Sequence, residues 1–348
     1  MFIDLKETAR LLKENNNILL LSHSHPDGDT LGSATALAYA LMQQGKRVAV
    51  KCGDRIPKDF DFMFAEMADE EFEPEFIVAV DVADPKLLGR DFEGIYTEKI
   101  NLCIDHHGSN VLYAPKTWLE AESASAAEMI YLLLCEMETE ITPQIASCLF
   151  TGVATDTGCF RFSNTTVRTF EIAAKLAASG ADTYNIIQVF FETKTRTYAA
   201  LEKLAIEGMR FYCNDRCAFI TVTQDMYRRS GSDESEVDRL ANLPRQIEGV
   251  LVGVTMRELK DGSFKASVRT HGDIDASEIC GRLGGGGHVG AAGCTLYGTK
   301  QQATNSLIKE IQDEITAFLA NGSGDGRPDA EPPDDGGKGP QACAGISV

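Results

Sequence analysis

The stretch "SHSHPDGDTLGSA" at residues 22–34 places two histidines and two aspartates within seven positions. The apolar run that leads into it, residues 17–23, predicts a buried parallel strand. The residues after it predict a helix that ends at Gly45. Pro26 and Gly28 bend the chain sharply between these two elements, so the ionisable side chains can converge there. The strand, the polar turn and the helix together predict the first part of a parallel α/β fold.

The same pattern recurs further along the chain. Apolar runs that end in polar residues predict strands at residues 47–53, 75–85 and 99–110. Amphipathic or small-residue segments predict helices at residues 4–15, 122–137 and 142–158. Alternating strands and helices indicate an α/β fold with a parallel sheet and helices on both of its faces. Ligands of such sheets bind beyond the carboxyl ends of the strands, which is where these polar clusters fall.

The rest of the chain predicts a second, smaller α/β domain. Residues 165–212 look mainly helical, and strand-like runs follow at residues 217–223, 249–259 and 264–272. From residue 321 the composition shifts to Gly, Pro and Asp, which cannot bury a core and predicts disorder. We therefore expect an N-terminal domain, a helical connector, a C-terminal domain and a tail at residues 1–185, 186–213, 214–320 and 321–348.

Composition narrows the class of protein. No run of the 348 residues reaches the roughly 18 apolar positions that a membrane helix needs, and the N-terminal segment lacks a signal-peptide core. The ten cysteines lie mostly inside apolar runs without framework spacing, which favours reduced thiols and a cytoplasmic protein. A net charge of −19 disfavours non-specific binding of long nucleic acids. A polyanionic ligand should therefore be short and held in a local site.

His23, Asp27 and Asp29 are the first candidate functional residues. Their imidazole nitrogen and carboxylate oxygens suit Mn²⁺, Mg²⁺ or Zn²⁺. A polar turn in which Asp29 or Thr30 caps the next helix would use the same residue types. This cluster by itself leaves both interpretations open.

Three further clusters change that balance. Asp81 and Asp84 follow one predicted strand, the Asp105-His106-His107 triplet follows another, and Asp156 ends a helix. So many carboxylates at one edge of a sheet would repel each other strongly without cations between them. Six side chains form the predicted ligand set: His23, Asp27, Asp29, Asp81, His106 and Asp156. A bridging carboxylate would hold two metal ions, the arrangement that activates a hydroxide to split phosphate esters.

These motifs resemble those of a known family. "HSHPDGDTLGSA", "VAVDVADP", "IDHHGSN" and "VATDTG" resemble the four motifs of the DHH phosphoesterases, and "FKASVRT" and "GGGGHVGAAG" resemble the DHHA1 domain. The resemblance runs from about residue 15 to residue 318. A two-domain chain of this length is most similar to the NanoRNase A branch, which comprises bifunctional oligoribonucleases and pAp phosphatases. The RecJ exonucleases share the motifs but carry further domains. The family-II pyrophosphatases have a different C-terminal domain, and the membrane-bound cyclic-di-AMP phosphodiesterases carry additional membrane and sensor segments.

The resemblance implies a role for each residue. It implies that one Mn²⁺ is bound by His23, Asp27 and Asp81. It implies that a second Mn²⁺ is bound by Asp29, Asp81, His106 and Asp156, with Asp81 as the bridge. His107 would face the scissile phosphate, and Asp105 would orient the histidine pair, so that His107, Asp105 and Asp81 form the catalytic set. His25 departs from the asparagine that is frequent in the family, and it is either a polar contact or a surface residue.

The C-terminal glycines suggest where the substrate binds. Successive glycines let backbone N–H groups approach an anion closely, although a flexible linker has the same composition. The resemblance implies that Gly286, Gly287, His288 and Arg269 bind the substrate. Residues 249–299 carry five basic and five acidic residues and are therefore neutral within an acidic chain. Arg161 could reach the substrate or form an ordinary salt bridge.

The sequence thus predicts a phosphoesterase that uses two Mn²⁺, with Mg²⁺ or another divalent ion as alternatives. The resemblance implies hydrolysis of RNA of roughly two to five nucleotides to nucleoside 5′-monophosphates, hydrolysis of pAp to AMP, a substrate cleft between the domains, and a homodimer. Two other functions stay open: a phosphodiesterase of cyclic or linear dinucleotide messengers, and a catalytically silent nucleotide sensor. The predicted partners are short RNA oligonucleotides, pAp or dinucleotides as substrates, and no interaction with a membrane is predicted.

Overall fold

The computed structural model describes residues 1–67 and 72–320, apart from the side chains of Asp238 and His288. The chain divides into two compact units, Met1–Thr193 and Lys194–Val348. The predicted connector bounds at residues 186 and 213 stay predictions, and the predicted disorder of residues 321–348 lies outside the described residues.

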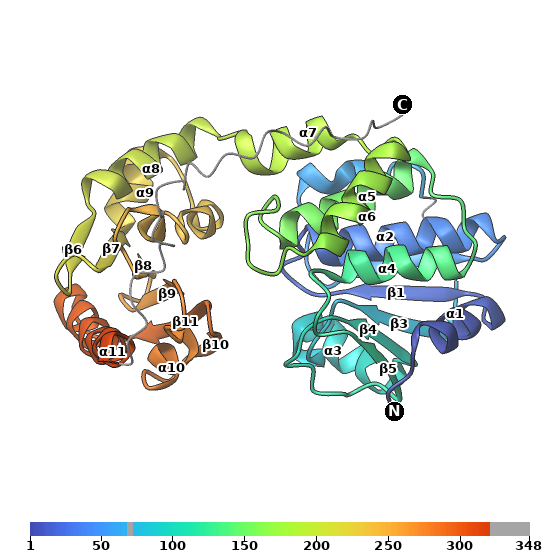
Figure 1. Ribbon diagram of the computed structural model, residues 1–348, viewed down its shortest axis with the longest axis horizontal. Helices are drawn as coiled ribbons and strands as arrows, with labels where there is room; N and C mark the ends of the chain where they lie inside the picture. Colours follow the sequence, from blue (N-terminus) through green and yellow to red (C-terminus); the bar gives the residue numbers. More distant parts are fainter. Residues whose placement is uncertain (68–71, 321–348) are drawn as a thin grey trace, which may run out of the picture. The chain divides into compact units, whose positions relative to one another are not determined.

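A five-stranded parallel sheet organises the first unit, with the strand order β2-β1-β3-β4-β5 (Figure 1). Its strands are β1 (Ile18–Ser22), β2 (Val48–Cys52), β3 (Phe76–Val80), β4 (Leu102–Asp105) and β5 (Lys116–Leu119). The first four lie within the predicted apolar runs. β1 and β3 are buried along their whole length, as expected for strands covered on both faces. The parallel α/β fold predicted from the sequence is therefore confirmed.

Helices cover both faces of this sheet (Figure 1). One face packs against α1 (Leu5–Glu14), α2 (Gly28–Gln43), α4 (Ala126–Glu136) and α5 (Pro143–Asp156), and α6 (Val167–Ala178) packs on α5. The other face packs against α3 (Arg90–Tyr96) and the short helical turn at Pro85–Leu88. Helix α7 (Thr183–Ile187) and a π-helical turn at Gln188–Glu192 complete the unit.

Two glycines set the distance between α2 and α5. A Cβ on Gly32 would lie 2.3 Å from the carbonyl oxygen of Cys148, and a Cβ on Gly152 would lie 2.6 Å from the Cβ of Ala127 and 2.8 Å from Oδ1 of Asp29. Such separations are far inside van der Waals contact, so only glycine allows this close approach. The contact brings the N-terminus of α2 and the C-terminus of α5 together, and Asp29 and Asp156 with them.

The second unit is built on a mixed six-stranded sheet with the order β10-β11-β9-β8-β7-β6. Its strands are β6 (Arg210–Tyr212), β7 (Cys217–Val222), β8 (Val252–Glu258), β9 (Phe264–Thr270), β10 (Gly286–His288) and β11 (Ala291–Leu296). One face packs against α10 (Ala276–Gly281) and α11 (Lys300–Ala320), and the other packs against α8 (Arg196–Glu207) and α9 (Gln224–Ser230). The α/β class predicted for this region is also confirmed.

The four glycines at residues 284–287 were expected to form a binding loop. The structure places two of them in a strand. Gly284 adopts a left-handed conformation after α10, with φ of +79°. Gly286 and Gly287 belong to β10, which pairs antiparallel with β11. Glycine is required in this strand because a Cβ on Gly287 would lie 2.5 Å from the carbonyl oxygen of Ala291.

The thiols and the helices of the described residues have two general properties. All nine cysteines in the described part of the chain are free thiols. None of the helices within residues 1–67 and 72–320 is long and apolar enough to cross a membrane.

Candidate metal centre

The predicted ligands gather at the carboxyl edge of the parallel sheet. His23 follows β1, Asp81 follows β3, and His106 follows β4. β1 and β3 are neighbours in the sheet, and the strand order reverses between them, which is the usual position of a ligand site in an open α/β sheet. Helices supply the other donors, since Asp27 and Asp29 open α2 and Asp156 closes α5.

One group of donors consists of His23, Asp27 and Asp81, whose ligand atoms lie within 4.8 Å of one another. The Nε2 atom of His23 lies 3.7 Å from Oδ1 of Asp27 and 3.6 Å from Oδ2 of Asp81. Nδ1 of His23 lies 2.8 Å from the carbonyl oxygen of Ser24. If Nδ1 donates in that contact, the Nε2 lone pair faces the two carboxylates, as a metal ligand requires.

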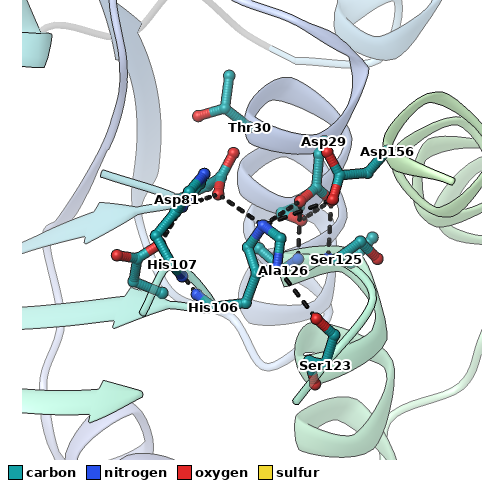
Figure 2. A network of polar contacts seen from close by, with 12 residues as sticks. Asp29, Thr30, Asp81, His106, His107, Ser123, Ser125, Ala126 and Asp156 are labelled. Atoms are coloured by element: carbon teal, nitrogen blue, oxygen red, sulfur yellow. Dashed lines mark hydrogen bonds and ion pairs between the residues drawn. The ribbon is translucent and has the colours of Figure 1, made fainter. Parts of the chain in front are cut away.

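A second group consists of Asp29, His106 and Asp156 and satisfies the same 4.8 Å limit. Figure 2 shows Nε2 of His106 at the centre of three carboxylates. It lies 3.5 Å from Oδ1 of Asp81, 3.7 Å from Oδ2 of Asp29 and 3.6 Å from Oδ2 of Asp156. The two oxygens of Asp81 thus face different groups, Oδ2 toward His23 and Oδ1 toward His106. One carboxylate joins both halves of the centre.

His107 lies beside this centre and is held by Asp105. Oδ1 of Asp105 accepts hydrogen bonds from the backbone N–H groups of His106 and His107 and lies 2.8 Å from Nδ1 of His107. Oδ2 of Asp105 accepts a 2.6 Å hydrogen bond from the side-chain amide of Asn110. Nδ1 of His107 is also 3.3 Å from Oδ1 of Asp81, so Asp81, His106 and His107 form a third possible donor group.

The buried atoms of the centre fit divalent cations. Oδ1 of Asp81 and Nε2 of His106 are buried and have no hydrogen-bond partner among the described residues. Buried polar atoms are rarely left in that state. A divalent ion bound by these nitrogen and carboxylate oxygen atoms would satisfy both of them and would neutralise the clustered charge.

The charges of the centre perturb its pKa values. Burial raises the pKa of Asp156 to about 7, and the carboxylates of Asp81 and Asp27 add to the rise while the nearby histidines oppose it. Burial and the carboxylates of Asp81 and Asp156 also hold the pKa of Asp29 well above its usual value. Burial opposes protonation of His23, but Asp27 and Asp81 outweigh it and raise its pKa to about 11. The protein therefore holds protons where metal ions would bind.

The backbone at Asp81 is strained. This residue is 3% exposed and adopts a left-handed conformation with φ of +60°. A non-glycine residue in this region costs of order 1–3 kcal/mol and persists only where the surrounding structure enforces it. Here the N–H of Asp81 donates a 2.8 Å hydrogen bond to the carbonyl of Ile104 on the neighbouring strand. The strained turn directs the carboxylate into the centre.

Comparison with known proteins now identifies the family. A model of the DHH family N-terminal domain matches residues 17–153, and a model of the DHHA1 domain matches residues 216–321. The bifunctional oligoribonuclease and PAP phosphatase NrnA of Thermus thermophilus is 31% identical over 307 residues, which cover 86% of this chain and 90% of that protein. The chain belongs to the DHH family of metal-dependent phosphoesterases.

Two other similarities extend this result. The cyclic-di-AMP phosphodiesterase GdpP of Geobacillus thermodenitrificans is 25% identical over 332 residues, which cover 87% of this DHH chain but 48% of that protein. The crystal structure of an exopolyphosphatase-related protein from Bacteroides fragilis has a TM-score of 0.79 and 22% identity, and the match covers 91% of this chain and 97% of that one. This structural similarity supports the fold alone.

The predicted substrate residues of the DHHA1 domain lie on β9 and β10, the two strands that flank β11 in the sheet. Arg269 on β9 pairs with Ala291 on β11, and Ala291 pairs in turn with His288 on β10. The guanidinium of Arg269 donates a hydrogen bond to the carbonyl of Val268. A Cβ on Gly286 would meet no atom within 4 Å, so the backbone there is open. The side chain of His288 is outside the described part of the structure.

Several predictions about individual residues need correction or remain open. The cap of α2 is Asp27, not Asp29 or Thr30, because its Oδ1 accepts hydrogen bonds from both of their N–H groups. Asp84 caps the turn at Pro85–Leu88 by accepting a hydrogen bond from the N–H of Lys86. The side chain of His25 is 93% exposed and lies 3.4 Å from Asp54.

Arg161 forms no salt bridge in the described structure. Its Nε donates to the carbonyl of Gly158, and its guanidinium lies 6.0 Å from the ring of Phe191. The contacts seen here therefore do not favour the ordinary ion pair that the sequence left open.

Sequence reasoning missed the residues that orient the predicted ligands. Thr30 donates to the carbonyl of Val80, directly before Asp81. The carbonyl of Ser123 lies 3.1 Å from Nδ1 of His106, and Asn110 fixes Asp105. Asn110 stands inside the quoted DHH motif and could have been chosen from it. Ser123 acts through its backbone, so no side-chain pattern marks it.

Proposed function

We propose that this protein is a Mn²⁺-dependent phosphoesterase that hydrolyses RNA of roughly two to five nucleotides to nucleoside 5′-monophosphates and pAp to AMP. The observation that carries the proposal is the convergence of six donors in two groups that share Asp81. The similarity to the Thermus thermophilus oligoribonuclease and PAP phosphatase supports the substrate class.

In this proposal His23, Asp27 and Asp81 hold one ion, and Asp29, Asp81, His106 and Asp156 hold the other. Two bound divalent ions supply a water-derived nucleophile at neutral pH and neutralise the oxygens of the scissile phosphate. The carboxylate of Asp81 would contribute to both ion sites, because Oδ2 faces His23 and Oδ1 faces His106. The N–H groups of Ala126 and Ala127 hold both oxygens of Asp29 in place.

His107 donates a proton or a hydrogen bond to the substrate. Burial opposes its protonation, but Asp105 and Asp81 outweigh burial and raise its pKa to about 9. In the metal-free protein His107 is therefore mostly protonated near neutral pH, and a protonated imidazole can assist an anionic oxygen or a leaving group. Asp105, held by Asn110, fixes the orientation of the ring. Arg269 and the backbone at Gly286 and Gly287 would hold the rest of the substrate, together with His288.

A second candidate keeps this chemistry and changes the substrate to a linear or cyclic dinucleotide messenger. The similarity to the cyclic-di-AMP phosphodiesterase of Geobacillus thermodenitrificans favours it, although the chain spans about half of that protein. Both candidates use the same metal centre, so only substrate preference separates them.

The test is product analysis by ion-exchange chromatography with Mn²⁺ present. The substrates are pApA, a 24-nucleotide RNA, pAp and cyclic-di-AMP. Asp81→Asn is the inactive reference. Asp84→Asn is the matched control, because it removes a carboxylate three positions away that caps a short turn.

Each outcome has a distinct meaning. The proposal predicts rapid release of AMP from pApA and pAp, slow cleavage of the long RNA, loss of activity in Asp81→Asn and full activity in Asp84→Asn. Cleavage of cyclic-di-AMP alone would overturn the substrate and keep the chemistry. Tight nucleotide binding without turnover, with Mn²⁺ bound, would replace the enzyme with a nucleotide sensor.

A further inference from the structure

A short stretch at residues 123–127, here called the orienting segment, contacts two predicted ligands through its backbone (Figure 2). The carbonyl oxygen of Ser123 lies 3.1 Å from Nδ1 of His106. The N–H groups of Ala126 and Ala127 donate hydrogen bonds of 2.7 Å and 2.9 Å to the two oxygens of Asp29. The N–H groups of Ala126 and Ala127 open helix α4, where backbone N–H groups have no partner within the helix and the helix dipole favours a negative charge.

Two side chains from the following part of the chain hold this orienting segment. The guanidinium of Arg168 on α6 donates a 2.7 Å hydrogen bond to the hydroxyl of Ser123. The side-chain amide of Asn164 donates to the carbonyl of Ala124 at 2.9 Å and to the carbonyl of Asp156 at 3.1 Å. Asn164 thus ties the orienting segment to the end of α5, which carries the third ligand of the same metal.

Arg168 is also the counterion of a buried carboxylate. Nε of Arg168 lies 3.1 Å from Oε2 of Glu128, whose side chain is 0% exposed. The same carboxylate oxygen accepts a 3.4 Å hydrogen bond from the N–H of Ala124. A second carboxylate, that of Glu120, lies 3.7 Å from the guanidinium. The planar fork of arginine can meet Glu128 and Ser123 at once, whereas a lysine ammonium is a single point of charge.

These contacts serve one half of the metal centre. They reach His106, Asp29 and Asp156, and the other half is held by different groups. His23 contacts the carbonyl of Ser24, and Asp27 accepts from its own helix terminus. Within the described residues, neither the contacts of Arg168 nor the hydrogen bonds of the orienting segment reach an atom of the His23 half.

We propose that Arg168 is a positioning residue that sets the affinity of the Asp29, His106 and Asp156 half of the centre for its metal ion and leaves the His23 and Asp27 half unchanged. The proposal rests on the proposed function, because it assumes that these residues bind two ions. It assigns Arg168 no contact with the substrate or with a metal ion.

The expected loss of metal affinity follows from the behaviour of other metalloproteins. Removing a group that orients a metal ligand costs roughly 10- to 100-fold in metal affinity. Arg168→Gln should therefore weaken one Mn²⁺ by at least about tenfold and change the other by less than about twofold. Arg168→Lys keeps the charge beside Glu128 and loses the fork, so its affinity should lie between those of the wild type and Arg168→Gln.

The experiment is calorimetric titration of the metal-free full chain with MnCl₂. Two variants supply references: Asp156→Asn removes a ligand from one half, and Asp27→Asn removes a ligand from the other. Arg10→Gln is the matched control, because Arg10 also pairs with two glutamates but lies on the exposed surface of α1. Arg168→Gln should weaken the same Mn²⁺ that Asp156→Asn weakens, and Arg10→Gln should give the isotherm of the wild type.

A double variant distinguishes a loss of folding stability from a loss of ligand positioning. Arg168→Gln leaves the carboxylate of Glu128 buried without its counterion, which by itself destabilises the protein. Glu128→Gln combined with Arg168→Gln removes that buried charge but does not restore the hydrogen bond to Ser123. Positioning predicts that the double variant regains thermal stability and still binds one Mn²⁺ weakly.

Three results would overturn the inference: equal weakening of both ions in Arg168→Gln, no weakening of either, or wild-type affinity in the double variant. The proposed function fails in a different way, since the wild type would then bind no Mn²⁺ at this centre. Two ions bound tightly by both the wild type and Arg168→Gln would leave the proposed function standing and remove Arg168 from it.

Discussion

His107 is the residue for which the structure offers two roles. Its Nδ1 lies 2.8 Å from Asp105, which suits a group that is oriented toward the substrate. It also lies within 4.8 Å of ligand atoms of Asp81 and His106, which suits a metal ligand. The two roles predict different effects of the same substitution.

We expect His107→Gln to lower kcat by roughly 10²- to 10⁴-fold, because it removes a proton donor from the reaction, and to leave both Mn²⁺ affinities within about twofold. Steady-state kinetics at saturating Mn²⁺ and calorimetry of the metal-free protein measure the two quantities. A tenfold loss of Mn²⁺ affinity would make His107 a ligand instead.

Asp156 gives a pH-dependent prediction for the metal-free protein. Its pKa in the folded protein is about 7, above the ordinary aspartate value of 3.8, so the folded state keeps a proton that the unfolded state loses. The stability due to that proton is fully present below pH 4 and is lost as the pH rises to about 7.

In EDTA, the wild type should therefore lose stability relative to Asp156→Asn between pH 5 and pH 7.5, by about 2 kcal/mol. Thermal unfolding of both proteins at both pH values measures the difference in stability between them. The contributions of groups that titrate in both proteins cancel in this difference. A constant gap between the two proteins would show that Asp156 is already ionised at pH 5.

At the residue scale, the sequence allowed the donors to be predicted but not their supports. His23, Asp81 and the Asp105-His106-His107 triplet each follow an apolar strand, so their position at one sheet edge could be inferred. The roles of Ser123, Asn164 and Arg168 depend on contacts between α4, α5 and α6. Such contacts arise only when those helices pack together, and no local sequence pattern predicts this packing.

At the scale of elements, the packing of α2, α4 and α5 determines the geometry of the centre. A Cβ on Gly152 would lie 2.6 Å from Cβ of Ala127 and 2.8 Å from Oδ1 of Asp29. Any larger residue must therefore separate these helices and displace a predicted ligand.

Gly152→Ala should destabilise the protein by about 1–3 kcal/mol, as overpacking of a core does, and should also weaken Mn²⁺ binding. Gly94→Ala in α3 is the matched control, since a Cβ there meets no atom within 4 Å. Alanine should be neutral or slightly stabilising at that exposed helical position. Chemical denaturation and Mn²⁺ titration of both variants test the prediction, and wild-type behaviour of Gly152→Ala would contradict it.

Most elements could be predicted from apolar periodicity, and the exceptions have physical reasons. β5 is only four residues long, and its residues Lys116–Leu119 show no continuous apolar run. Helix α11 was not among the predicted elements, although its residues lie within the predicted C-terminal domain at residues 214–320. The strand β10 contains two glycines, which have low strand propensity and are placed there by close packing against β11.

At the scale of the whole molecule, the net charge of −19 and the buried carboxylates both favour the binding of cations. All six predicted ligands lie in the first unit, so bound metal stabilises the folded form of that unit. A ligand present at 100 times its Kd stabilises the folded state by about 2.7 kcal/mol.

Saturating Mn²⁺ should therefore raise the melting temperature of the wild type by roughly 5–10 °C, and EDTA should reverse the rise. Differential scanning fluorimetry measures it. Asp81→Asn, which lacks the shared carboxylate, should show little or no shift. An equal shift in Asp81→Asn would mean that Mn²⁺ acts on the acidic surface and not at the centre.

At the scale of the whole molecule, the sequence predicts two domains because the helical stretch after residue 165 separates two sets of strands. The structure assigns residues up to Thr193 to the first unit, since α7 packs on α5. The sequence could not place that division, because a helix that packs on the first core and a helix that leaves it have similar amphipathic patterns.

The most direct measurement is the anomalous difference map of a crystal grown with MnCl₂ and recorded at the manganese absorption edge. The account predicts two peaks, one between His23, Asp27 and Asp81, and the other between Asp29, Asp81, His106 and Asp156. Peaks elsewhere, or none at these residues with Mn²⁺ in excess, would contradict a two-metal centre in this protein.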